Sequence, residues 1–223
     1  PVLRLSINST FNGMIELKSI YKSFEDKDVL MDINARFDNG KTNLIIGQSG
    51  SGKTVLMKCI VGLLTPERGE ILYDGRNFVN MNKKEKIALR REMGMIFQSA
   101  ALFDSLSVLE NVMFPLDMFS NDTLRDRIRR ARFCLDRVNL IDAQKKYPGE
   151  ISGGMQKRVA IARAIALNPQ YLFCDEPNSG LDPKTSLVID ELIHDITVEF
   201  GITTIINTHD MNSVMGIGEH ILY

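Results

Sequence analysis

The fold of this 223-residue chain is decided by residues 44–54, which read LIIGQSGSGKT. The last eight of these residues match the pattern G-x-x-x-x-G-K-[ST] at every fixed position. The apolar triplet before the pattern predicts a short buried strand. The apolar positions after it predict one face of a helix: Val55, Leu56, Ile60 and Leu63. A strand, a glycine-rich turn and a helix in this order form the context in which the pattern binds phosphate.

This loop is expected to hold the phosphates of a nucleotide. Its glycines let successive backbone N–H groups converge on phosphate oxygens at the start of the helix. Lys53 adds a cation for the β and γ phosphates, and Thr54 offers a hydroxyl to Mg²⁺. A glycine-rich turn capped by Thr54 is the alternative, and the flanking strand and helix argue against it. The predicted phosphate-binding residues are Gly47, Gln48, Ser49, Gly50, Ser51, Gly52, Lys53 and Thr54.

A second motif follows downstream, where the apolar run YLFC at residues 171–174 ends in Asp175 and Glu176. Adjacent residues in a strand point to opposite sides, so two adjacent carboxylates can take different tasks. We expect Asp175 to hold Mg²⁺, directly or through water, and Glu176 to polarise an attacking water as general base. The alternative is a pair of acids that faces solvent at the end of a strand.

A third motif lies between the other two, at residues 151–158, ISGGMQKR. Ser152 is predicted to cap the start of a helix, and Gly153 and Gly154 leave room for a phosphate to approach. A cap without any ligand is the alternative. That alternative does not explain why the segment shares a chain with a complete phosphate loop.

Taken together, the three motifs resemble those of the ATP-binding subunit of an ABC transporter, and the resemblance extends from about Met14 to the end of the chain. It implies that ATP and Mg²⁺ are the cofactors and that the active site forms only in a homodimer. In such a dimer Ser152, Gly153, Gly154 and Gln156 contact the ATP held by the other subunit. It also implies that Gln98 contacts Mg²⁺ and the attacking water.

The same resemblance assigns three further residues. Asp182 is expected in the loop that couples the two subunits, and His209 is expected to sense the γ phosphate. Adenine requires a flat apolar surface, and the resemblance places Phe24 there, with Tyr21 as the second choice. A histidine or an aromatic residue at such positions is otherwise more often structural.

The order of apolar patterns predicts an α/β fold of the P-loop type. Alternation over residues 15–37 predicts an antiparallel β subdomain, and short apolar runs near 44–46, 95–97, 172–175 and 203–207 predict a mostly parallel core sheet. Apolar residues recur at helical spacing between about 100 and 166, which predicts an inserted helical subdomain: Leu124, Ile128, Ala131, Leu135 and Val138. A further helix of mixed charge is expected over residues 83–92.

The ends of the chain carry two expectations. Residues 1–13 lack the periodicity of the rest and read as a leader or a natural extension, so the ABC ATPase domain is assigned to residues 14–223. The apolar residues 221–223 read as a strand that is cut short, so C-terminal sequence is expected to be missing.

Composition narrows the class of protein. The 27 basic residues nearly balance the 28 acidic ones, so no nucleic-acid partner is expected. The arginines of residues 125–132 share an amphipathic helix with Asp126 and Asp136 and predict a solvated face. The dispersed cysteines predict buried thiols in a reducing compartment: Cys59, Cys134 and Cys174. Apolar runs of the roughly 20 residues that cross a bilayer are missing, so we expect a cytoplasmic protein.

The stretch at residues 97–116, FQSAALFDSLSVLENVMFPL, is expected to identify the partner, because the permease docks there in the family that the motifs resemble. Its amino-acid sequence is similar to that of the phospholipid-transport ATPases of the maintenance-of-lipid-asymmetry system and the mammalian-cell-entry class. This resemblance implies an ATPase that powers phospholipid transport between bacterial membranes, peripheral on the cytoplasmic face of the inner membrane. A permease would dock on a groove lined by Leu102, Phe103 and Phe114, and a mammalian-cell-entry lipid-binding protein would share the complex.

Two other interpretations stay open. The ATPase of an amino-acid or metal importer would share every catalytic motif and differ only in the docking stretch. A soluble ABC protein that acts on ribosomes, DNA or iron–sulfur assembly is disfavoured by the single motif set and the near-neutral charge.

Overall fold

The computed structural model describes residues 13–25, 27–210 and 216–222 and contains two sheets with helices around them. The first sheet is antiparallel, in the order β2-β1-β4-β5. Its strands are β1 (Ile15–Phe24), β2 (Lys27–Phe37), β4 (Arg68–Tyr73) and β5 (Arg76–Asn77). The antiparallel β subdomain predicted from residues 15–37 is therefore present and gains two strands from further along the chain.

The second sheet is parallel and positions the functional loops. Its order is β6-β7-β8-β3-β9, from β3 (Thr42–Ile46), β6 (Met93–Ile96), β7 (Tyr171–Asp175), β8 (Thr203–Thr208) and β9 (His220–Leu222). Each paired strand runs parallel to its neighbour, so the carboxyl ends of β3, β7 and β8 meet at one edge. The register aligns Ile46 with Thr208, and Asp175 with Asn207, across this edge.

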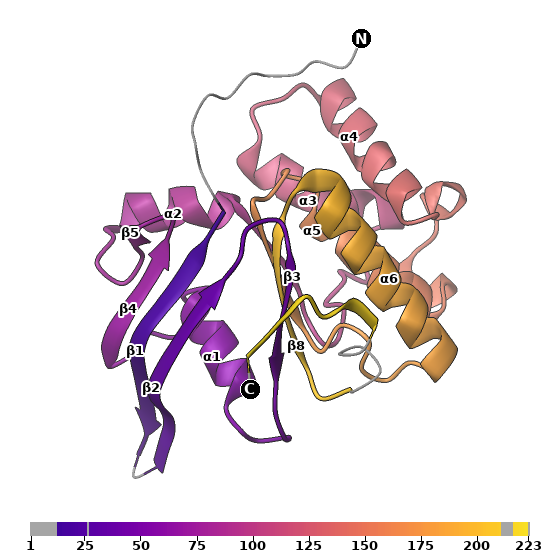
Figure 1. Ribbon diagram of the computed structural model, residues 1–223. Helices are drawn as coiled ribbons and strands as arrows, with labels where there is room; N and C mark the ends of the chain where they lie inside the picture. The colour runs from indigo at the N-terminus through magenta and orange to yellow at the C-terminus, as the bar shows by residue number, and fades with distance from the viewer. Residues whose placement is uncertain (1–12, 26, 211–215, 223) are drawn as a thin grey trace.

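Helices cover both faces of the parallel sheet. Helix α1 (Lys53–Ile60) lies between the two sheets (Figure 1), where Leu56, Met57 and Ile60 are buried in one apolar cluster with residues of β1. The opposite face is covered by α5 (Gly153–Ala164) and α6 (Pro183–Phe200). Alternation along β7 explains the two layers, because Phe173 packs toward α1 and Leu172 toward α6.

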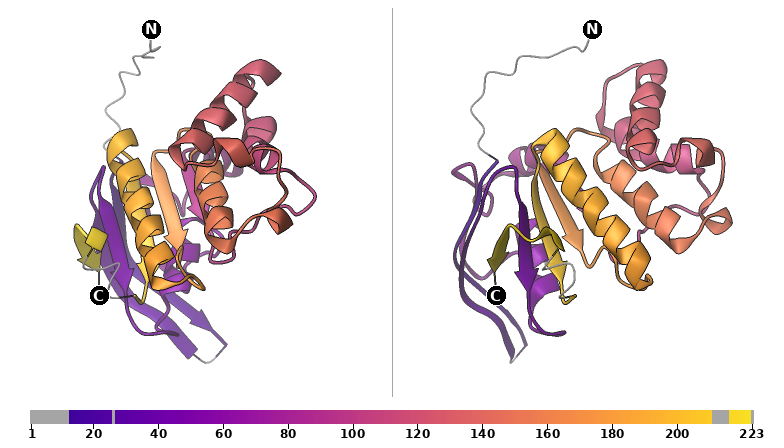
Figure 2. Two further views of the ribbon diagram at one scale, coloured as in Figure 1. Left: turned by 90° about the vertical axis from the view of Figure 1, so that its right-hand side faces the viewer. Right: turned by 45° about the vertical axis from the view of Figure 1, so that its right-hand side comes forward.

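The helical subdomain consists of α3 (Val108–Phe119), α4 (Leu124–Arg137) and α5, and it stands to one side of the sheets (Figure 2). Short 3₁₀ turns at Ile141–Ala143 and Pro148–Glu150 connect α4 to α5, and α2 (Lys83–Arg91) lies beside the antiparallel sheet. Polar side chains cap the starts of five helices by accepting backbone N–H bonds: Asn82, Ser107, Thr123, Ser152 and Asp182.

The α/β P-loop fold is confirmed, but several predicted positions are wrong. Leu63 lies beyond the end of α1 and is 58% exposed, because the chain turns at Gly62 with a positive φ. Phe97 falls after β6 rather than within it, and residues 100–107 form a loop. Leu124 is the first residue of α4 and is exposed, so the buried stripe of that helix starts later.

The predicted leader falls almost wholly on residues 1–12, which lie outside the described residues. Gly13 is buried, and its carbonyl accepts a hydrogen bond from the Thr203 hydroxyl. In the described part of the chain, no helix is both long enough and apolar enough to cross a membrane.

Candidate active site

The phosphate loop joins β3 to α1 as the sequence predicts. Gly52 stands at the N-cap of α1 with φ +101°, and a Cβ there would lie 3.1 Å from the Val29 carbonyl oxygen. Both constraints require glycine at this position. A cavity of about 470 Å³ opens beside the loop, lined by Gly47, Gln48, Ser51, Gly52 and Lys53 together with residues of β2 and β3.

Lys53 is directed along the loop. Its Nζ donates to the carbonyl oxygens of Gly47 at 2.7 Å and Gln48 at 2.9 Å, and the side chain is buried. These bonds hold the ammonium group at the mouth of the backbone cradle. The arrangement fits a loop that receives anionic oxygens from solvent.

Asp175 and Thr54 meet at the carboxyl edge of the sheet. The Thr54 hydroxyl donates to Asp175 Oδ1 at 3.2 Å, and Asn207 Nδ2 donates to the same oxygen at 3.1 Å. A hydroxyl and a carboxylate side by side are the hard oxygen donors that Mg²⁺ prefers, so these residues fit the cation. Among the described residues no cluster of three or more His, Cys, Asp or Glu side chains could hold a metal. Mg²⁺ needs none, because it is bound by one or two carboxylates, substrate phosphates and water.

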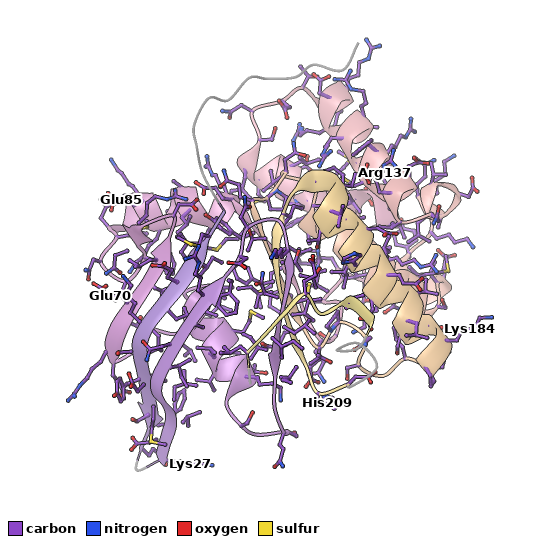
Figure 3. The ribbon with its side chains drawn as sticks, in the orientation of Figure 1. Lys27, Glu70, Glu85, Arg137, Lys184 and His209 are labelled. Carbon is purple, nitrogen blue, oxygen red and sulfur yellow. The ribbon has the colours of Figure 1, made fainter. Side chains whose placement is uncertain are left out.

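Glu176 lies at the centre of a second group of side chains. Gln98 Nε2 donates to its Oε2 at 3.2 Å, and His209 Nδ1 lies 3.0 Å from its Oε1. A carboxylate only accepts, so the proton of this second bond is on His209 Nδ1. The three predicted residues therefore come together from the ends of three parallel strands. Figure 3 shows His209 at this edge, with Lys184 in the first turn of α6.

The backbone of Glu176 is constrained. Its φ of +48° lies in the left-handed region, which non-glycine residues seldom adopt. Its N–H donates to the Asn207 carbonyl oxygen at 3.0 Å, and its own carbonyl accepts from Ser179 N–H at 3.1 Å. Bonds on both sides hold the unfavourable conformation and so fix the direction of the carboxylate.

In the described part of one subunit, residues 152–156 of the third motif take no part in the hydrogen bonds on Glu176. Ser152 caps α5 by accepting from Met155 N–H at 3.3 Å, as predicted. Gln156 Nε2 donates to the Pro148 carbonyl oxygen at 3.0 Å. Asp182 caps α6 and accepts from the Thr185 hydroxyl at 2.6 Å, which lowers the pKa of Asp182. Contacts with the ATP of a second subunit stay a prediction for five residues: Ser152, Gly153, Gly154, Gln156 and Asp182.

The two aromatic residues expected to contact adenine lie on β1. Phe24 lies at the end of β1 and is 43% exposed, with Lys22 Nζ 5.2 Å from its ring centroid. Tyr21 is partly buried in the same strand. Neither side chain lines the cavity beside the phosphate loop.

Several residues at the site belong to none of the site roles that the motifs predict. Asn207 is fully buried and holds Asp175, and the Ser179 hydroxyl accepts from Gln98 Nε2 at 3.1 Å. Lys157 and Arg163 of α5 donate to carbonyl oxygens of residues 98–101. Only Asn207 carried a usable signal, because it ends a predicted strand at the same sheet edge as Asp175.

The predicted docking stretch contains an apolar groove. A cavity of about 550 Å³ is lined by Phe97, Phe103, Phe114 and Phe119, among others, and the rings of Phe103 and Phe114 are 4.6 Å apart. Phe103 is 42% exposed. Leu102 does not line the groove; it packs against the core of the helical subdomain, so this part of the prediction is wrong.

A P-loop that meets two adjacent carboxylates at the carboxyl edge of a parallel sheet is the arrangement of a P-loop nucleotide-binding domain. Residues 30–179 match the family described as ABC transporter, and the chain belongs to that family. Its fold and motifs are those of an ABC ATPase domain.

Curated relatives carry three different descriptions. The probable ribonucleotide transport ATP-binding protein mkl of Mycobacterium leprae is 40% identical over 89% of this chain and 57% of its own length. The methionine import ATP-binding protein MetN of Clostridium acetobutylicum is 39% identical over 93% and 65%. The intermembrane phospholipid transport system ATP-binding protein MlaF of Haemophilus influenzae is 38% identical over 93% and 79%. The chain thus spans little more than half of some relatives.

Solved structures agree with the fold. The ABC transporter cassette MJ0796, described as dimeric, superposes with a TM-score of 0.84 at 34% identity, over 94% of this chain and 93% of that one. A second structure of that cassette is described as a post-hydrolysis dimer bound to ADP and Pi and gives a TM-score of 0.83.

Proposed function

We propose that this chain is the ATP-hydrolysing subunit of an ABC transporter that moves phospholipid between bacterial membranes. The observation that carries the hydrolytic part is the pair of contacts on Glu176, one from Gln98 and one from His209. These contacts occupy one lone pair on each carboxylate oxygen and leave others for a water molecule.

In the proposed reaction, Glu176 accepts a proton from the water that attacks the γ phosphate, and Gln98 and His209 orient the carboxylate. Lys53 and the backbone N–H groups of the phosphate loop hold the β and γ phosphates. Thr54 and Asp175 hold Mg²⁺, which neutralises negative charge on the phosphates when it is bound. Phe24, with Tyr21 as the alternative, is proposed to stack on adenine.

The active site is proposed to be completed by a second copy of the chain. Ser152, Gly153, Gly154 and Gln156 make no hydrogen bond to the phosphate loop within the described part of one subunit. The dimeric MJ0796 cassette supports a composite site, in which the Ser152 segment of one subunit faces the ATP of the other. Asp182 is proposed to couple the two sites.

The phospholipid proposal rests on the docking stretch and on one relative. This chain covers 79% of the length of MlaF, against 57% of mkl and 65% of MetN. The aromatic groove of Phe103 and Phe114 supports a permease partner, because an exposed apolar patch rimmed by polar residues is typical of a partner surface. A mammalian-cell-entry lipid-binding protein and a place on the cytoplasmic face of the inner membrane belong to the same proposal.

The second candidate is the ATPase of an amino-acid or metal importer, which MetN favours. Purification of the full-length protein from its native membrane in mild detergent separates the two. A permease that co-purifies with phospholipid and a mammalian-cell-entry protein supports the lipid proposal, and ATP-dependent movement of labelled phospholipid between vesicles then tests it. A permease that binds methionine or metal instead contradicts it. A soluble partner alone contradicts both.

A further inference from the structure

Helix α5 holds the loop that follows β6 through two cationic side chains. Lys157 Nζ donates to the carbonyl oxygen of Gln98. Arg163 donates through Nη1 to the carbonyl oxygen of Ala101 and through Nη2 to that of Ala100, both at 2.7 Å. Three carbonyl groups within four residues are therefore held by one helix. We call Lys157, Arg163 and these carbonyl groups the α5 clamp.

The loop held by the α5 clamp has an unfavourable backbone conformation. Ala100 has φ +59° and Ala101 has φ +48°, both in the left-handed region. A Cβ atom makes this region unfavourable, and two such residues in succession persist only where surrounding groups fix them. The guanidinium of Arg163 supplies charge-assisted hydrogen bonds at this point. The conformation of the loop thus depends on α5.

Lys157 is built into the interior next to the catalytic group. Its side chain is 6% exposed in the folded chain. Burial lowers the pKa of Lys157, and the negative charge of Glu176 opposes that effect. A buried ammonium group requires partners, and Lys157 Nζ donates to the Gln98 carbonyl oxygen.

Gln98 connects this clamp to the chemistry. Its backbone accepts from Lys157, whereas its side chain donates to Glu176 at 3.2 Å and to Ser179 at 3.1 Å. A change in the backbone at Gln98 therefore changes the direction of the amide that holds the catalytic carboxylate. Displacements of about 1 Å are enough to lower catalytic rates substantially.

We propose that Lys157 is a positioning residue that acts through Gln98: by holding the Gln98 carbonyl it places the Gln98 amide on Glu176. The proposal rests on the ATP-hydrolysing part of the proposed function. It adds a physical link from the helix that starts at Ser152 to the catalytic glutamate of the same subunit. The Ser152 motif and the general base then share one rigid connection, five residues along α5.

A double-mutant cycle on the full-length protein tests this link. Lys157→Met in the wild-type background is expected to lower kcat for ATP by between about tenfold and a hundredfold, with KM for ATP within about twofold. In the Gln98→Ala background the backbone carbonyl is retained but the positioned amide is gone. There Lys157→Met is expected to lower kcat by less than about twofold. The matched control is Lys145→Met, which changes an exposed lysine of the same subdomain.

Two results would overturn the proposal. Equal rate losses in the wild-type and Gln98→Ala backgrounds would mean that Lys157 acts independently of the amide. A raised KM with unchanged kcat would assign Lys157 to nucleotide binding. If Lys157→Met does not fold, Lys157→Gln replaces it in the same cycle, judged by the same two criteria. Loss of turnover in Glu176→Gln is measured first, because retained turnover there would contradict the proposed function and not the clamp.

Discussion

The carboxyl edge of the parallel sheet and the helical subdomain place functional groups in different ways. At the sheet edge, strand register places the functional groups. Asp175 and Asn207 are register partners, and their side chains form a hydrogen bond. In the helical subdomain, long or branched side chains reach back to loop carbonyls, as Arg163 does to Ala100 and Ala101. Strand register can be anticipated from a sequence, whereas such individual contacts cannot.

The same contrast appears around the aromatic groove lined by Phe103 and Phe114. Asn111 of α3 is fully buried, accepts from Phe103 N–H at 2.8 Å, and donates to the carbonyl oxygens of Phe103, Leu106 and Ser107. One amide thus holds the loop that presents Phe103. The groove depends on a polar residue that no apolar pattern reveals.

The largest expected effect tests the sheet edge. Lys53→Ala removes the cation that is proposed to bind the β and γ phosphates, so ATP turnover is expected to fall by at least about a thousandfold. Steady-state phosphate release measures it. The control is Lys58→Ala, which removes an exposed lysine of the same helix. Turnover near the wild-type rate in Lys53→Ala would contradict the phosphate-loop assignment.

The next effect concerns the general base. Glu176→Gln keeps the shape of the side chain but loses the base, so turnover is expected to fall by about a hundredfold to ten-thousandfold while ATP and Mg²⁺ still bind. ATP should then hold two subunits together, which size-exclusion chromatography with and without ATP detects. A variant that stays monomeric with ATP would count against the composite site. The experiment uses the full-length protein.

The third prediction separates two properties of the groove: the stability of the loop that carries Phe103, and the binding of a permease by the Phe103 ring. Asn111→Ala leaves buried polar groups of the Phe103 loop without partners and is expected to cost about 1–3 kcal/mol of unfolding free energy. Phe103→Glu changes only a half-exposed ring, so stability is expected to change by about 0.5 kcal/mol or less, while permease binding and lipid transport are lost.

Denaturant unfolding and permease pull-down measure the two quantities. Val198→Glu introduces the same charge at an exposed apolar position on α6 and serves as control. Normal assembly and transport in Phe103→Glu would remove the main mechanistic support for permease docking at this groove.

Apolar patterns predict the two sheets, and the family resemblance names Gln98 and His209 beside Glu176. The three residues meet because each follows a strand that ends at the same sheet edge. The sequence does not predict the groove correctly at Leu102, which follows two left-handed alanines and packs against the core. It also misses Lys157, whose role depends on a carbonyl 59 residues earlier in the chain. Contacts between side chains and distant backbone carry no periodic signal.

The smallest expected effect is a pH dependence of the unfolding free energy. It comes from two buried thiols, one behind the phosphate loop and one in the helical subdomain. Cys59 lies on α1 behind the phosphate loop, and Cys134 lies on α4; both are fully buried. Burial raises the pKa of each thiol to about 11 from an ordinary value of 9.0. A thiol whose pKa is raised by folding contributes stability that is complete below pH 9 and is lost as the pH rises through 11.

A variant that lacks one of these thiols loses the pH dependence of stability that the thiol causes, whereas the wild type keeps it. The difference in unfolding free energy between wild type and Cys134→Ala should be constant below about pH 8.5 and shrink by about 1 kcal/mol at about pH 10, and Cys59→Ala should behave alike. Urea unfolding at several pH values measures both. A gap that stays constant up to that pH for Cys134 but shrinks for Cys59 would mean that the helical subdomain admits solvent to its core. The hydrogen bonds from the helical subdomain to the loop carbonyls would then open more easily than the contacts between strands at the sheet edge.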